Sequence, residues 1–183
     1  MHIKTDSRVK GNLIPNKDGA LEILQRVGCS ERVIQHCLIV SEYATEIAKQ
    51  INKNGLKVDI QLVKIGGLLH DIGRSRTHDI KHGIEGACLA REYGLSERLI
   101  GIIINHIGAG ITDEEAGKMG LPPGNYMPVT LEEKIVAHAD NLVNDNEIFP
   151  ISKIVVILKK KGRSETIIKR IVDLNSQIVG LIH

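Results

Sequence analysis

Apolar residues return every three or four positions through most of this 183-residue chain. This spacing marks one face of an α-helix, and it repeats in segment after segment. The longest apolar stripe follows Ser30, a residue type that caps helix starts, and ends before Gly55. The last stripe follows Ser164 and steps through Ile167, Ile171 and Leu174. A chain of such segments must bury its apolar faces against one another, so the sequence predicts an all-α, multi-helix bundle.

Capping and stop residues divide the chain into predicted helices. The expected helices span residues 21–27, 30–55, 59–73, 82–93, 96–106, 130–143 and 164–182. The run 154–158 is rich in β-branched residues and would suit a strand by propensity. We predict a helix there, because the sequence has no second convincing strand to pair with it. Residues 1–16 are predicted to be a loose arm, and the glycine- and proline-rich stretch 107–129 a long irregular loop that acts as a lid.

The length suits one domain over residues 1–183, with a core at 30–145. Residues 146–183 are predicted to form a C-terminal helical extension that packs on the core or on a partner. Its wide apolar stripe makes a homodimer reasonable.

The composition excludes several classes of protein. The net charge of +2 gives no strong signal for nucleic-acid binding. Three scattered cysteines without a CxxC motif argue against a disulfide framework and a cysteine zinc site. The N-terminus has no apolar signal region, and no run approaches the ~18 apolar residues of a membrane span. We therefore expect a cytoplasmic protein with no membrane partner.

His70 and Asp71 form an adjacent pair at the end of a predicted apolar helix. A neutral imidazole and a carboxylate are ordinary ligands for divalent metals. Neighbouring residues on a helix point about 100° apart, so the pair cannot grip one ion like a pincer, but Asp71 has two oxygens and could bridge two ions. A His-Asp pair alone is weak support, since His78-Asp79 follows in a polar link. The predicted helices also carry His36, His82, His106 and Asp140, mostly at or near their ends.

The ordered pattern resembles the HD-domain metal-dependent phosphohydrolase superfamily, and more narrowly its His-Asp-Ile-Gly (HDIG) subset. The resemblance covers roughly residues 30–145. The motifs that carry it are His36, 68–74 (LLHDIGR), 82–87 (HGIEGA), 104–106 (INH) and 134–140 (KIVAHAD).

This resemblance implies an all-α fold and a site for one or two divalent ions, of Mn, Fe, Co, Ni, Mg or Zn. It implies that a first metal is held by His36, His70, Asp71 and Asp140. A second metal would be held by the bridging Asp71 together with His82 and His106. Ile107 stands where some dinuclear members have a second histidine, and no Gly-Tyr-Pro element follows His106, which speaks against the cyclic-di-GMP branch.

The function implied is hydrolysis of a phosphate ester or anhydride by metal-activated water, with Asp71 as the catalytic residue. The resemblance also implies a small phosphorylated substrate as the partner, and specifically a nucleotide, because members of the family usually act on nucleotides. Arg74, His78 and Lys81 are the candidate substrate-binding residues, although Arg74 also suits a solvated helix end.

Two alternatives stay open. One is a di-iron HD-type oxygenase, which uses the same six ligand positions. The other is a low-activity nucleotide-binding or sensing protein.

Four other residues receive a structural interpretation. We expect His138 to be structural and Tyr126 to anchor its loop. We expect Glu114 and Glu115 to be solvated rather than catalytic.

Overall fold

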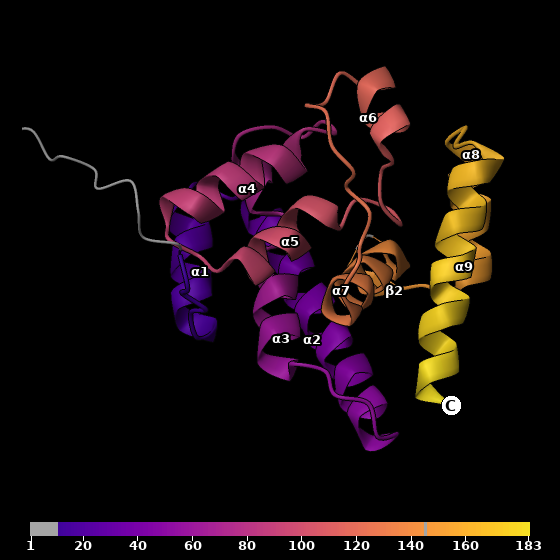
Figure 1. Ribbon diagram of the computed structural model, residues 1–183, viewed down its shortest axis with the longest axis horizontal. Coiled ribbons are helices and arrows are strands. Elements are labelled where there is room, and N and C mark those ends of the chain that lie inside the picture. The colour runs from indigo at the N-terminus through magenta and orange to yellow at the C-terminus, as the bar shows by residue number, and fades with distance from the viewer. Residues whose placement is uncertain (1–10, 145) are drawn as a thin grey trace, which may run out of the picture.

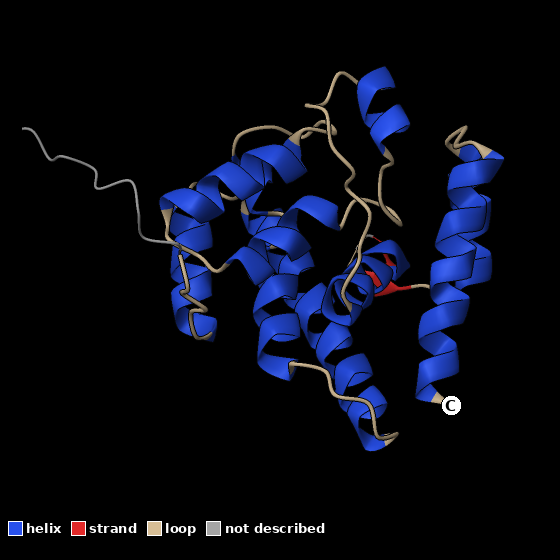
Figure 2. Cartoon of the chain, viewed as in Figure 1, coloured by secondary structure: helices blue, strands red, loops and turns tan. Residues whose placement is uncertain are grey.

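The chain folds into a helical bundle, seen here in a computed structural model that describes residues 11–144 and 146–183 (Figures 1 and 2). The all-α prediction is therefore confirmed. Its elements, in chain order, are α1 Lys17–Arg26, α2 Glu31–Lys53, α3 Ile60–Leu69, the 3₁₀ turn η1 Ile72–Ser75, α4 His82–Glu92, α5 Glu97–Asn105, α6 Asp113–Lys118, α7 Leu131–Leu142, β1 Val143–Asn144, β2 Glu147–Ile148, α8 Ile151–Lys160 and α9 Glu165–Ile182.

The long helix α2 is the centre of the bundle and packs on α3 and α7. Its start is fixed by Ser30, whose side chain accepts a hydrogen bond from the backbone N–H of Val33. Cys37, Val40 and Ala44 on its inner face are fully buried. Because burying each large apolar side chain stabilises the fold by roughly 1.5–3 kcal/mol, this core holds the helix ends in fixed places.

The C-terminal helices α8 and α9 lie side by side as an antiparallel pair along one flank of the bundle (Figure 1). Helix α9 packs on α7 and buries Ile168, Ile171, Leu174 and Ile178. The ambiguous run 154–158 lies inside α8 and is helical. Within the described ranges, no helix has the length and apolar character needed to cross a membrane.

Two local features differ from the expectation. The stretch 107–129 contains α6. This helix begins with a capping box between Thr112 and Glu115. Its neighbours Ile111 and Tyr126 pack in a small apolar cluster of their own, and the Tyr126 hydroxyl donates to the carbonyl of Pro122 as a loop anchor. Strands β1 and β2 pair antiparallel, with Val143 opposite Ile148 and Asn144 opposite Glu147. A six-residue helix and two-residue strands are too short to leave a periodic pattern in the sequence.

The predicted loose arm falls mostly outside the described residues, which begin at 11. Within the described part, Leu13 lies beside the turn between α4 and α5. Its N–H donates to the carbonyl of Gly94 at 3.3 Å, and its carbonyl accepts from the N–H of Ser96 at 2.9 Å. This part of the predicted arm is therefore attached to the bundle.

Gly73 is predicted to be the glycine least tolerant of substitution. A Cβ at this position would lie 1.9 Å from the carbonyl oxygen of His82 and 2.5 Å from the backbone nitrogen of Gly86. We expect Gly73→Ala to lower the free energy of unfolding by about 2–3 kcal/mol, since backbone atoms cannot move aside like a flexible side chain. Gly180→Ala is the control, because nothing lies within 4 Å of its Cβ and it stands in α9. Urea unfolding that finds both variants as stable as the parent would contradict this packing.

Candidate metal centre

The six predicted ligands converge on one place because each stands at or near the end of a helix. His36 comes from α2, and His70 and Asp71 follow α3 directly. His82 is the first residue of α4, and His106 follows α5. Asp140 comes from the last turn of α7. Helix α7 packs on α2 and α3, α5 packs on α3, and α4 packs on α5 and η1. This packing brings together ligands that are up to 104 residues apart in sequence.

Asp71 lies between two groups of histidines. On one side, His70 Nε2 lies 3.7 Å from Asp71 Oδ2 and 3.4 Å from Asp140 Oδ1. His36 Nε2 lies 2.9 Å from the same Asp140 oxygen. His36, His70 and Asp140 form one cluster that could hold an ion, and His70, Asp71 and His106 form another.

On the other side, Asp71 Oδ1 lies 3.4 Å from Nε2 of both His82 and His106. The two Nε2 atoms are 3.1 Å apart. Each oxygen of Asp71 therefore faces a different set of imidazoles, as a bridging carboxylate requires.

The backbone fixes which ring nitrogens face the centre. Nδ1 of His70 lies 2.7 Å from the carbonyl oxygen of Gly67, and Nδ1 of His106 lies 2.7 Å from that of Ile103. Nδ1 of His82 lies 2.6 Å from the carbonyl of Asp79. A carbonyl can only accept a hydrogen bond, so each Nδ1 carries a proton. Whenever one of these rings is neutral, its Nε2 therefore presents a lone pair to the centre.

The centre contains buried polar atoms without a hydrogen bond. Among the described residues, His70 Nε2 and Asp71 Oδ1 are buried and have no hydrogen-bond partner, although charged or imidazole groups lie 3.4 Å from each. Leaving such groups unpaired costs roughly 1–3 kcal/mol each. A divalent cation beside Asp71 would satisfy both atoms, and imidazole nitrogens with carboxylate oxygens are a fitting donor set.

The electrostatics of the centre also suit a cation. Burial alone would raise the pKa of Asp71, but the imidazoles of His70 and His106 keep it well below its usual value. Burial would lower the pKa of His70, yet the carboxylates of Asp71 and Asp140 raise it to about 9. Burial, and then the neighbouring His106, lower the pKa of His82 to about 4. The centre therefore combines ionised carboxylates with a neutral His82, and a positive charge near His70 is favoured.

Of the three predicted substrate-binding residues, Arg74 and His78 line cavities at the centre and Lys81 does not. Arg74 Nε donates to Asp71 Oδ2 at 2.5 Å, so this guanidinium lies at the centre. His78 is exposed and lines a cavity together with His36 and Arg74. Lys81 is exposed at the start of α4 and, within the described residues, lines neither cavity at the centre. These roles remain predictions.

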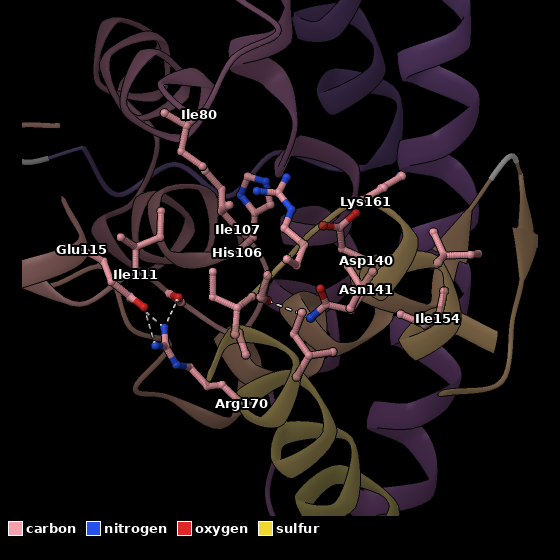
Figure 3. A pocket seen from close by; sticks show the side chains of 18 of the residues that line it. Ile80, His106, Ile107, Ile111, Glu115, Asp140, Asn141, Ile154, Lys161 and Arg170 are labelled. Carbon is pink, nitrogen blue, oxygen red and sulfur yellow. Dashed lines mark hydrogen bonds and ion pairs between the residues drawn. The ribbon is translucent and has the colours of Figure 1, made fainter. Parts of the chain in front are cut away.

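Two cavities of about 310 Å³ each open on the centre. The first reaches His82, His106 and Asp140 and is walled by α8, α9 and residues 107–111 (Figure 3). The second reaches His36 and Asp71. Arg74 lines both. The centre is therefore accessible to a small molecule.

The sequence did not reveal the ion pair at one side of the first cavity. Arg170 of α9 donates from Nη1 and Nη2 to the carboxylate of Glu115 at 2.9 and 2.7 Å, and from Nη1 to the carbonyl of Gly110 (Figure 3). The expectation that Glu115 is solvated was wrong, because α9 covers it. Glu114 is exposed and pairs with Lys118. His138 lies outside the centre and close to the ring of Tyr43, which suits a structural role.

We expect Glu115→Gln to lower the free energy of unfolding by about 1–2 kcal/mol at pH 7, through loss of this charge-assisted pair. Hydrogen bonding to Arg170 lowers the pKa of Glu115 from its usual 4.5 to about 2. The folded state thus binds fewer protons here than the unfolded state, so the pair stabilises above pH 4.5 and its contribution disappears as the pH falls towards 2. Unfolding measured from pH 7 to pH 2, with the exposed Glu114→Gln as control, checks this. If the stability lost in Glu115→Gln stayed the same at low pH, the loss could not come from the ion pair between Glu115 and Arg170.

Comparison with known proteins identifies the family. Residues 33–145, more than half of the chain, match the HD domain. The chain therefore belongs to the HD domain family, whose members bind divalent metals, and the predicted superfamily is confirmed.

The relatives include an uncharacterized protein and two named enzymes. An uncharacterized protein of Methanocaldococcus jannaschii is 54% identical over 89% of this chain and 96% of its own length. A tRNA (cytidine(56)-2'-O)-methyltransferase of Thermoplasma volcanium is 43% identical over 93% of this chain, but the match covers 50% of that protein. Ribonuclease Y of Thermosipho melanesiensis is 34% identical over 64% of this chain and 19% of its own length.

A solved structure has the same fold. The HD domain of the L. monocytogenes phosphodiesterase PgpH, in complex with cyclic-di-AMP, superimposes with a TM-score of 0.53. The match covers 88% of this chain and 97% of that chain at 19% identity. At this identity, the likeness concerns the fold alone.

Proposed function

We propose that this protein is a metal-dependent phosphohydrolase that cleaves a phosphate ester or anhydride of a nucleotide. The observation that carries the proposal is Asp71, whose carboxylate lies between two sets of imidazoles and holds a buried oxygen without a hydrogen bond. The adjoining cavities leave room for a substrate.

The proposed ligands follow from the two groups of side chains. His36, His70, Asp71 and Asp140 would hold one ion, and Asp71, His82 and His106 a second. A bound divalent ion lowers the pKa of a coordinated water and polarises a phosphoryl oxygen. The carbonyls behind His70, His82 and His106 keep the rings oriented, so the donor atoms need no rearrangement before they bind.

Arg74 is the proposed phosphate-binding residue. Among residues 11–144 and 146–183, the hydrogen bond of the Arg74 side chain comes from Nε to Asp71, so Nη1 and Nη2 are left for a phosphate oxygen. A guanidinium can make two parallel hydrogen bonds to a phosphate and supplies charge where the leaving oxygen becomes negative. His78, at the second cavity, would contact the same substrate from the solvent side.

The relatives favour hydrolysis over the two alternatives. A ribonuclease and a phosphodiesterase share the family or the fold, and both act on phosphate diesters by name. The full ligand set supports an active enzyme over a sensor. The oxygenase alternative draws on the same ligands without a further observation in its favour.

The direct test offers a panel of nucleoside mono- and polyphosphates, cyclic dinucleotides and bis(p-nitrophenyl) phosphate, and follows free phosphate, nitrophenol and, by chromatography, the nucleotide products. Each substrate is offered with Mn, Co, Ni or Mg. Turnover of at least one substrate that requires an added ion is expected. A silent panel combined with a mixed-valent di-iron signal in anaerobically purified protein would favour the oxygenase, and a silent panel with tight nucleotide binding would favour the sensor.

A further inference from the structure

Part of the first cavity comes from outside the matched HD domain, which ends at residue 145. Helices α8 and α9 contribute apolar side chains to its wall, among them Ile154, Ile157, Leu158 and Ile167. Ile157, Leu158 and Ile167 are only partly buried, so a ligand in the cavity could cover apolar surface that is now open. The helix pair α8 and α9 thus packs on α7 and also forms one wall of the cavity that reaches His82, His106 and Asp140.

The turn between α8 and α9 adds positive charge to the same cavity. Lys161 and Arg163 flank Gly162, whose φ of +70° closes the turn, and both side chains line the cavity and are exposed. Across residues 11–144 and 146–183, neither side chain makes an ion pair. Each of the two other arginines of the cavity has its charge compensated by a carboxylate: Arg74 pairs with Asp71 and Arg170 with Glu115. Uncompensated positive charge therefore concentrates at this turn.

The chemistry of the side chains that line the cavity indicates a ligand. Metal-ligand side chains and Arg74 suit one phosphate, aliphatic side chains suit a base and sugar, and Lys161 with Arg163 suit a further anionic group. A volume of about 310 Å³ is at the small end of ligand pockets, so it accommodates one nucleoside unit. We propose that Lys161 and Arg163 form a second phosphate subsite, and that the pocket takes a nucleotide unit with a phosphate on each side of the nucleoside. This proposal rests on the proposed function for the place of the first phosphate.

Binding measurements test the subsite apart from turnover. The probes are the phosphorothioate analogues of adenosine 3′,5′-bisphosphate and adenosine 5′-monophosphate, which resist hydrolysis, titrated by calorimetry into the metal-loaded full chain. We expect Lys161→Ala/Arg163→Ala to weaken binding of the bisphosphate analogue about tenfold and of the monophosphate analogue less than about twofold, as loss of charge-assisted contacts to one phosphate implies. The control is Lys160→Ala, an exposed lysine of α8 that is not among the residues lining the cavity.

Equal affinities of parent and double variant for the bisphosphate analogue would overturn the subsite. So would an equal loss for both analogues, because that points to a general charge effect rather than to a second phosphate. Failure of the hydrolysis panel is a separate result. A selective loss in the double variant would support the subsite even in a protein that turns over nothing, whereas hydrolysis with no selective loss would leave the proposed function intact and remove the subsite.

Discussion

Replacing Asp71 by Asn is expected to lower metal-dependent phosphohydrolase activity at least about 100-fold. The amide keeps the shape of the side chain but removes the negative charge that faces His70 on one side and His82 and His106 on the other. An ion that stabilises the transition state by several kcal/mol accounts for a loss of this size. Rates on the best substrate of the panel, measured at saturating ion, give the result.

The sequence itself offers a matched control in the second His-Asp pair. Asp79 is exposed, and its carboxylate accepts a hydrogen bond from the N–H of Lys81, which an Asn side chain can also accept. Its backbone carbonyl, which orients His82, is unchanged by substitution. We expect Asp79→Asn to retain activity within about twofold. Undiminished activity of Asp71→Asn would refute the mechanism proposed for this centre.

Adding a divalent ion to the metal-free protein is expected to raise its stability strongly. An ion at 1,000 times its dissociation constant stabilises the native state by about 4 kcal/mol. For a chain of this length, that corresponds to a rise in melting temperature of roughly 8–16 °C. The rise has a structural cause, because the ion would pair the buried His70 Nε2 and Asp71 Oδ1. Thermal unfolding with and without Mn, Co, Ni, Mg or Zn measures it.

Two histidine variants separate ligation from general stability. His70→Ala removes a buried donor at the centre, so the ion-dependent rise should largely disappear. His138→Gln changes a buried histidine outside the centre, so it should lower the melting temperature of the metal-free protein and keep the rise. A similar rise in both variants would mean that the ion binds elsewhere.

The sequence predicted the bundle well because its helices are long and periodic. The stripe in α2 and the caps Ser30 and Ser96 identify helices whose ends then had to meet. His70 and His106 were correctly expected at helix ends, since both directly follow the last helical residue. The sequence did not predict α6 or the paired strands β1 and β2, because elements this short show no period.

The interactions between distant segments could not be predicted. Glu115 reads as a solvated loop residue until α9 places Arg170 55 positions away against it. Nothing in the sequence distinguishes Lys161 and Arg163 from other basic residues, whereas packing of α8 and α9 places them at the cavity. Long-range contacts of this kind depend on how the helices pack, and single-chain periodicity carries no information about them.

Metal content measured together with activity on the same samples tests the central claim most directly. Protein stripped with a chelator is reloaded stepwise, and bound ion per chain is determined by mass spectrometry while hydrolysis is assayed. We predict that activity rises in proportion to bound ion and stops rising at one or two ions per chain. Hydrolysis that persists in protein without detectable ion, or a fully loaded protein that hydrolyses none of the phosphate esters, would contradict the account.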